Sequence, residues 1–135
     1  MTAEEILDTK KSFAIIGATP NKERYGYEVF EILRAHGYQV FPINPKYPEI
    51  DGVACYPSLM ALKTPPDVVL TALAPANTEQ VIDSIKALGI ETVWMPPGCW
   101  SENAVKRCQE LGLNCIYDEC PVWMLKLRSR GKARS

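Results

Sequence analysis

The loop from Gly17 to Gly26 has residue types suited to binding an anion, and it lies between an apolar run and a helical pattern. Gly17 lets the backbone approach a bound group closely. The N-terminus of the following helix presents free N–H groups and a partial positive charge, which favour phosphate. The loop adds hydrogen-bonding and cationic side chains, namely Thr19, Asn21, Lys22 and Arg24. The alternative is that Gly17 and Pro20 only shape a turn.

A second group of candidate residues follows the strand-like run Gln39–Ile43. Domains that bind NAD usually place Asp or Glu there, where it accepts hydrogen bonds from the ribose. This chain has Asn44-Pro45-Lys46 instead, and the fingerprint Gly-x-Gly-x-x-Gly is absent after Gly17. An ammonium group attracts a phosphate on the ribose, which favours NADP or coenzyme A. The alternative for Lys46 is a solvated surface lysine.

Composition narrows the class of protein. The chain has 135 residues, of which 47% are hydrophobic and 23% charged, as in a soluble single-domain protein. No stretch approaches the ~20 apolar residues of a membrane-spanning helix, and a net charge of −1 argues against nucleic acid as partner. Five basic residues fall within 126–135, which we expect to be a flexible, solvated tail, with a partner-binding tail as the alternative.

The cysteine pattern indicates free thiols. The five cysteines include no Cys-x-x-Cys pair, and with a single histidine their spacing fits no common zinc site. The N-terminus lacks the layout of a signal peptide. We therefore expect a reducing, cytoplasmic compartment and no bound metal. The cysteines are Cys55, Cys99, Cys108, Cys115 and Cys120.

Apolar runs alternate with amphipathic stretches along the whole chain. The runs predict strands at 12–16, 39–43, 67–73, 91–95 and 114–117. Helices are predicted at 2–9, 25–36, 57–62, 77–88, 101–111 and 121–127, with Asn77 as an N-cap. This alternation is typical of an α/β fold, a doubly wound, Rossmann-like, five-stranded parallel sheet with helices on both faces. We expect a single domain and the strand order 3-2-1-4-5.

A doubly wound sheet binds its ligand beyond the carboxyl ends of the strands, where the winding reverses. For the expected order 3-2-1-4-5, strands 1 and 4 are neighbours in space, and this point lies between the loops that follow them. The loops that reach this edge are 17–26, 44–56, 74–78, 96–100 and 118–121.

Several of these segments resemble one known family. The stretches Phe13–Thr19, Gly37–Lys46 and Cys55–Leu59, with shorter matches through Cys120-Pro121, are similar to the CoA-binding domain family. Its members are small Rossmann proteins that resemble the N-terminal domain of the succinyl-CoA synthetase alpha subunit. The resemblance covers about Lys11 to Leu125 and implies that the chain binds coenzyme A.

The resemblance also implies a role for particular residues. Gly17, Ala18 and Thr19 would lie against the pyrophosphate, with Asn21, Arg24 and Tyr25 near the phosphates at the helix start. Asn44, Pro45 and Lys46 would flank the adenosine and its ribose phosphate. Ala74, Pro75 and Thr78 would close the other side of the groove. Gly98 and Cys120 complete the expected set near the pantetheine end, where the loop 96–100 departs from the family pattern by its cysteine.

No catalytic residue is assigned. His36 lies at a helix end, which argues against phosphohistidine chemistry, and no hydrolytic triad is visible. We expect non-catalytic binding of coenzyme A or an acyl-CoA, with a sensing, presenting or thiol-protecting role. The alternatives are an NADP-dependent oxidoreductase and a regulatory interaction module with a vestigial groove. A homodimer or a partner enzyme subunit is compatible with this assignment.

Two cysteines fall in loops predicted on the ligand side. We hypothesise that Cys99 or Cys120 forms a mixed disulfide with the thiol of coenzyme A, since exchange requires a reachable thiolate. The alternative is that both are inert, partly buried thiols.

Overall fold

A computed structural model describes the backbone of residues 1–134 and the side chains of residues 1–130. Five parallel strands form one sheet, in the order β2 (Gln39–Ile43), β1 (Ser12–Ile16), β5 (Val68–Thr71), β6 (Thr92–Met95) and β7 (Asn114–Tyr117). This confirms the predicted fold class, a Rossmann-like parallel sheet in a single domain. A short antiparallel hairpin, β3 (Glu49–Ile50) and β4 (Val53–Ala54), follows β2 and was not predicted.

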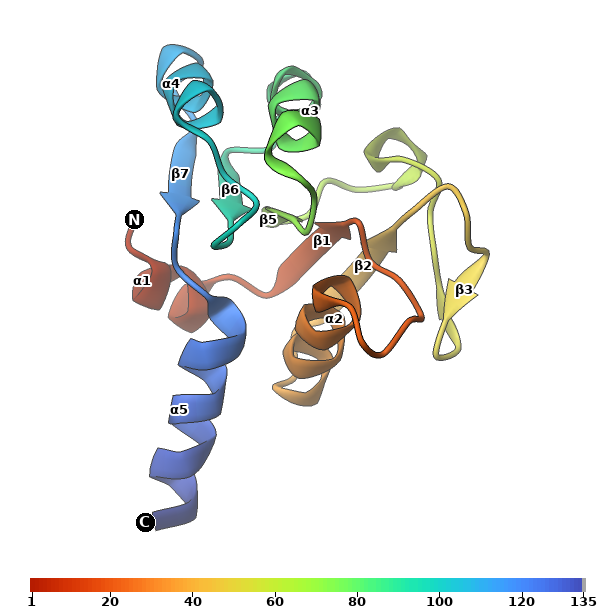
Figure 1. The fold of residues 1–135 in the computed structure, drawn as a ribbon, viewed down its shortest axis with the longest axis vertical. Coiled ribbons are helices and arrows are strands. Elements are labelled where there is room, and N and C mark those ends of the chain that lie inside the picture. Colours follow the sequence, from red (N-terminus) through yellow and green to blue (C-terminus); the bar gives the residue numbers. More distant parts are fainter. Residues whose placement is uncertain (135) are drawn as a thin grey trace.

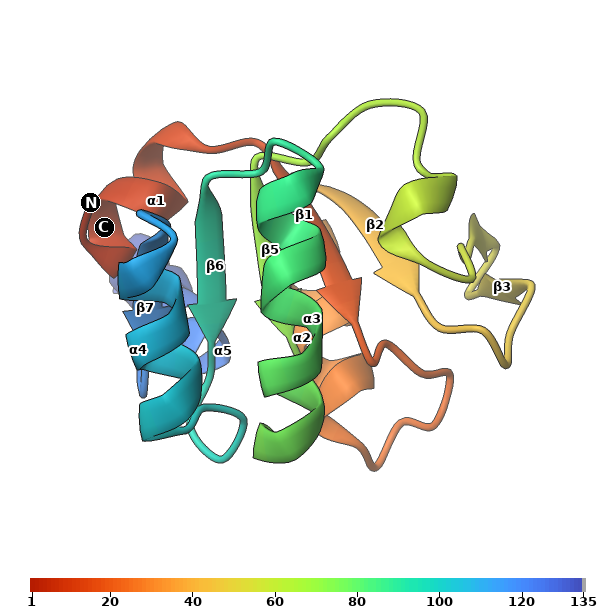
Figure 2. The same ribbon diagram turned by 90° about the horizontal axis from the view of Figure 1, so that it is seen from above.

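Helices cover both faces of the sheet (Figure 2). One face carries α1 (Ala3–Thr9), α2 (Tyr25–Ala35) and α5 (Pro121–Arg134). The other carries α3 (Pro75–Ala87), α4 (Glu102–Glu110) and a single 3₁₀ turn, η1 (Leu59–Ala61). Among the described residues, no helix is both long and apolar enough to cross a membrane.

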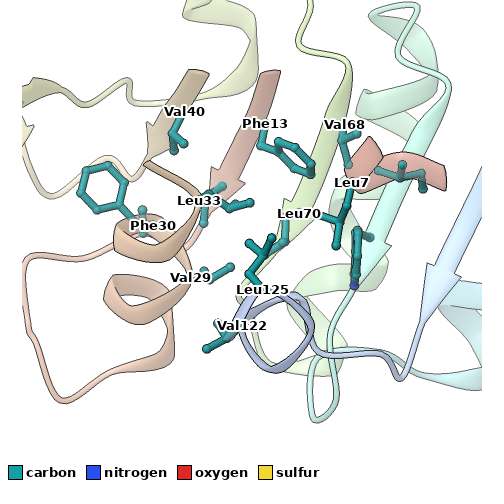
Figure 3. Close-up of a cluster of buried hydrophobic side chains, with 14 of the residues drawn as sticks. Leu7, Phe13, Val29, Phe30, Leu33, Val40, Val68, Leu70, Val122 and Leu125 are labelled. Atoms are coloured by element: carbon teal, nitrogen blue, oxygen red, sulfur yellow. The ribbon is translucent and has the colours of Figure 1, made fainter. Parts of the chain in front are cut away.

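The strands are buried on both faces because their side chains alternate between two cores. Phe13 and Ile15 of β1 pack with α1, α2 and α5, and Figure 3 shows part of that cluster. Ala14 belongs to the opposite core, beneath α3 and α4. Apolar side chains are therefore required at every central position of β1, which explains its continuous apolar run.

The predicted strand order is wrong at one place. Counted along the chain, the five strands lie in the order 2-1-3-4-5, because β5 pairs with β1 on the side opposite β2. All four residues of β5 are buried, as a central strand requires, whereas β2 contains Pro42. Proline cannot donate to a second neighbour and is confined to edge strands. Pro42 therefore favours the edge position of β2, whose outer side carries an isolated bridge between Ile43 and Tyr56.

Two helix boundaries also differ from the predictions. Helix α3 begins at Pro75, because proline is well suited to the first helical position, and Ala74 is its N-cap in place of Asn77. Helix α5 continues through Arg134, past the end expected at 127. Arg128 forms ion pairs with Glu4 and Asp8 of α1, which join this part of the helix to α1. The flexibility expected for residues 126–135 stays a prediction. Residue 135 lies outside the described residues.

Two glycines allow close contacts at the start of the loop after β1. A Cβ atom on Gly17, whose φ is +94°, would lie 2.2 Å from the carbonyl oxygen of Ala72. A Cβ atom on Gly26, in the first turn of α2, would lie 2.2 Å from the carbonyl oxygen of Gly17. Only glycine fits either position, so β1, α2 and the loop after β5 approach one another closely here.

We expect Gly26→Ala to destabilise the fold by about 1–3 kcal/mol, because the added methyl group overlaps backbone that cannot move freely. Within an ordinary helix the same substitution would stabilise by up to ~1 kcal/mol. Urea unfolding of the two proteins measures the difference.

Gly112→Ala is the matched control, because a Cβ atom there would meet nothing within 4 Å and only its φ of +72° opposes the substitution. We expect that variant to lose about 1 kcal/mol. A Gly26→Ala protein as stable as the wild type would contradict the close contact.

Candidate ligand-binding groove

The winding of the sheet reverses between β1 and β5. The chain leaves β1 for α2 on one face and leaves β5 for α3 on the other, so the two connections diverge at the carboxyl edge (Figure 2). Such a crevice is where doubly wound sheets bind ligands. The correction to the strand order therefore moves the expected binding position to the loops after β1 and β5.

A pocket of about 460 Å³ lies at this reversal, and we call it the polar pocket. Its lining combines backbone from the two diverging loops with polar and cationic side chains from the ends of β1 and β2. Seven of the sequence-predicted residues line it: Gly17, Thr19, Arg24, Tyr25, Asn44, Lys46 and Ala74.

Two helix N-termini without side-chain caps border the polar pocket. Arg24 is the N-cap of α2 and Ala74 that of α3, and neither side chain hydrogen-bonds to its helix. By contrast, Thr2 and Ser101 cap α1 and α4 with their hydroxyl oxygens. Uncapped first-turn N–H groups carry a partial positive charge. An anion in this pocket could accept hydrogen bonds from them.

The charges around the pocket have one sign. Arg24 and Lys46 are exposed, and among the described residues neither forms an ion pair. No carboxylate is found among the residues that line the polar pocket. Both cations are therefore available to a ligand with several negative charges.

A second pocket, of about 550 Å³, adjoins the first and is here called the apolar pocket. It lies between the end of β2, η1 and α3, and its walls include Pro45, Leu59, Met60 and Val81. Five residues line both pockets: Gly17, Asn44, Lys46, Leu73 and Asn77. The two pockets therefore form one continuous groove, the carboxyl-edge groove, with a charged end and an apolar end.

Asn44 holds two sides of this groove together. Its side-chain nitrogen donates to the carbonyl oxygen of Ala18 (2.9 Å), and its side-chain oxygen accepts from the backbone N–H of Lys46 (2.9 Å). The side chain thereby joins the loop after β1 to the loop after β2. Its role in this structure is to position the backbone around the pocket.

Other predicted residues lie outside the two pockets. Ala18 is fully buried, and Asn21 accepts a hydrogen bond from the Glu23 N–H within its own turn. Pro75 begins α3, and Thr78 is buried with its hydroxyl oxygen unpartnered in the structure. Gly98 takes a positive φ of +81° in the loop after β6.

Cys120 lies beside the polar pocket and contacts one of its lining residues. The hydroxyl of Tyr25 is 3.8 Å from the sulfur of Cys120. Burial, followed by the neighbouring thiol of Cys120, raises the pKa of Tyr25, so the hydroxyl keeps its proton at neutral pH. Cys99 is buried, and burial raises the pKa of its thiol.

Sequence reasoning missed several residues of the groove. Asn77 was expected to be the N-cap of α3. It lies instead within the first turn of this helix, and it lines both pockets. Pro75 was the signal for the earlier helix start. Met60 is 78% exposed and lines the apolar pocket, and no local pattern around it indicates that position. Within the described residues, no cluster of His, Cys, Asp and Glu is arranged to hold a metal ion.

Solved structures of similar proteins share the whole fold. A hypothetical protein from Pyrococcus horikoshii superposes with a TM-score of 0.84 at 33% identity, covering 94% of this chain and 87% of its own. A conserved hypothetical protein from Pyrococcus furiosus gives a TM-score of 0.81 at 29% identity, covering 84% and 98%.

Sequence comparison finds both a small relative and a large one. Uncharacterized protein YneT of Bacillus subtilis is 26% identical over 117 residues, 87% of each chain. An ADP-forming acetate–CoA ligase of Methanocaldococcus jannaschii is 31% identical over 81 residues, which are 60% of this chain but 12% of the ligase. A family model described as a CoA binding domain matches residues 11–126. The chain, with its groove at the reversal of a parallel sheet, belongs to the CoA binding domain family.

Proposed function

We propose that this protein binds coenzyme A or an acyl-CoA reversibly in the carboxyl-edge groove and has no catalytic turnover of its own. One observation carries the proposal: a pocket bordered by two cations and two uncapped helix ends continues directly into an apolar pocket. The nucleotide half of coenzyme A has the same sequence of parts, a pyrophosphate, a phosphorylated ribose and an apolar ring. Membership of the CoA binding domain family supports the same ligand.

Each part of the nucleotide corresponds to one part of the groove. The pyrophosphate would lie in the polar pocket, against Gly17 and the first turn of α2. The adenine ring would occupy the apolar pocket, in contact with Pro45 and Leu59. Lys46 lines both pockets, so its ammonium group is suited to the ribose phosphate between them.

NADP also carries a ribose phosphate, so it is the ligand to compare with coenzyme A. The loop after β1 lacks the glycine fingerprint of dinucleotide-binding sheets. The ligase relatives, by contrast, act on CoA according to their names. These observations favour coenzyme A over a hydride-transferring cofactor.

The position of the single histidine supports a binding role over phosphoryl transfer. The ring nitrogens of His36 contact the carbonyl oxygen of Ile32 (3.0 Å) and the hydroxyl of Ser129 (2.8 Å), between α2 and α5. His36 lines neither pocket of the groove.

We infer that the protein senses, presents or protects CoA. It would do so as a homodimer or with a partner enzyme, in a reducing cytoplasm.

Calorimetric titration of the reduced protein with coenzyme A, and separately with NADP, tests this function. We expect heat of binding for coenzyme A and at least tenfold weaker binding of NADP. Binding of neither nucleotide would contradict the proposal and favour an interaction module. Preference for NADP would favour an oxidoreductase.

The contact with the ribose phosphate is tested by Lys46→Glu. We expect binding of coenzyme A to weaken by about tenfold, because an exposed attractive charge becomes a repulsive one. Dephospho-CoA lacks that phosphate and should lose less than about threefold in affinity. Calorimetry with both ligands gives the two ratios.

Lys22→Glu is the matched control for net charge, because Lys22 is exposed and lines neither pocket. We expect it to affect both ligands to the same small degree. Equal losses for coenzyme A and dephospho-CoA in Lys46→Glu would refute the position assigned to Lys46.

A further inference from the structure

A thiol adjoins the charged end of the groove. Tyr25 lines the polar pocket, and its hydroxyl contacts the Cys120 sulfur at 3.8 Å. The loop after β7 and the start of α2 thus bring one sulfur atom and one hydroxyl together beside the pocket.

The backbone around Cys120 is held in a fixed position. Asp118 adopts a left-handed conformation with φ of 61°, and its N–H donates to the carbonyl oxygen of Met95 (3.0 Å). The indole N–H of Trp94, a fully buried residue, donates to the carbonyl oxygen of Glu119 (2.8 Å). The carbonyl of Cys120 then accepts the N–H of Met124 and opens α5. The sulfur is therefore presented from a rigid turn.

Access together with its contacts distinguishes Cys120 from the other thiols. Cys120 is partly exposed, whereas Cys99 is 8% exposed and burial raises its pKa. Cys108 is buried against Cys115, between α4 and β7. Cys55 is also partly exposed, and its thiol donates to the carbonyl oxygen of Asn44 (3.6 Å), which lines the polar pocket, but burial raises the pKa of Cys55. Among the partly exposed thiols, Cys120 is the one whose sulfur contacts a side-chain hydroxyl of a residue that lines the polar pocket.

We propose that Cys120 is a thiol-exchange site, which forms a mixed disulfide with the terminal sulfur of coenzyme A. This inference rests on the proposed function, because a pyrophosphate in the polar pocket would fix the start of the flexible pantetheine arm beside Tyr25. The oxidant is the disulfide of coenzyme A. The Cys120 thiolate attacks one of its sulfur atoms, the sulfur–sulfur bond breaks, and one coenzyme A leaves as thiolate and takes a proton from solvent. The second coenzyme A remains joined to the protein.

Tyr25 is suited to assist this exchange. Its hydroxyl remains protonated at neutral pH, because burial and the neighbouring thiols raise its pKa. It can therefore donate a hydrogen bond to the negative charge on the sulfur of Cys120. Tyr25 also lines the polar pocket, so this residue lies between a ligand in the pocket and the sulfur of Cys120.

The test is intact-mass analysis of the reduced protein after exposure to the disulfide of coenzyme A. We expect a mass increase of one coenzyme A per chain, reversed by a reducing agent. Peptide mapping of the wild-type adduct identifies the modified cysteine without relying on the folding of a variant. Cys120→Ser should show no adduct, and Cys99→Ser, the matched control, should show the same adduct as the wild type.

A competitor separates this inference from the proposed function. Adenosine 3′,5′-bisphosphate carries the nucleotide phosphates but no thiol, so it should slow the adduct at least tenfold by occupying the groove. The bisphosphate should not change the rate at which Cys120 reacts with 2-hydroxyethyl disulfide, because this disulfide carries no nucleotide for the groove to bind.

Three results would overturn the inference. Reversible binding of coenzyme A without any adduct would remove the exchange site and leave the proposed function standing. An adduct mapped to another cysteine would do the same. The third result is an adduct on Cys120 that the bisphosphate does not slow, together with no calorimetric binding of coenzyme A. That result would reject both the groove-directed exchange and the proposed function.

Discussion

Two backbone contacts that exclude a Cβ atom determine the geometry of the whole carboxyl edge. Gly17 lies against the carbonyl of Ala72, and Gly26 lies against the carbonyl of Gly17. The first contact joins the end of β1 to the loop after β5, and the second packs the first turn of α2 against the start of the loop after β1. Because both helix N-termini at the groove take their position from these segments, the direction of their free N–H groups depends on two missing side chains.

The fold class follows from local patterns, whereas the lateral order of the strands does not. A run such as Val68–Thr71 indicates a strand that is buried on both faces, but it does not say which neighbour it pairs with. Pro42 was nevertheless a local signal for the edge position of β2, because proline has no N–H to donate to a second strand. Arg128 of α5 forms ion pairs with Glu4 and Asp8, more than a hundred residues away, and no local pattern contains that contact.

The candidate site was predictable where it depends on loops after strands. The loop after β1 and the segment Asn44–Lys46 line the groove because every parallel strand ends at the same edge. The sequence did not show that the Asn21 side chain accepts a hydrogen bond within its own turn, so its role toward a ligand stays a prediction. Prediction failed for Met60, whose place in the wall depends on how η1 packs against α3.

The uncapped starts of α2 and α3 have a thermodynamic consequence. A missing N-cap costs about 1 kcal/mol, so the two uncapped starts together lower the stability of the fold by about 2 kcal/mol relative to a capped sequence. A ligand that accepts hydrogen bonds from both helix starts binds the native state and not the unfolded chain. The free energy of unfolding therefore rises with the concentration of that ligand. If that ligand is coenzyme A, the fraction of unfolded chain exposed to proteases falls as the coenzyme A pool rises. Cellular abundance of the protein would then follow the supply of its ligand.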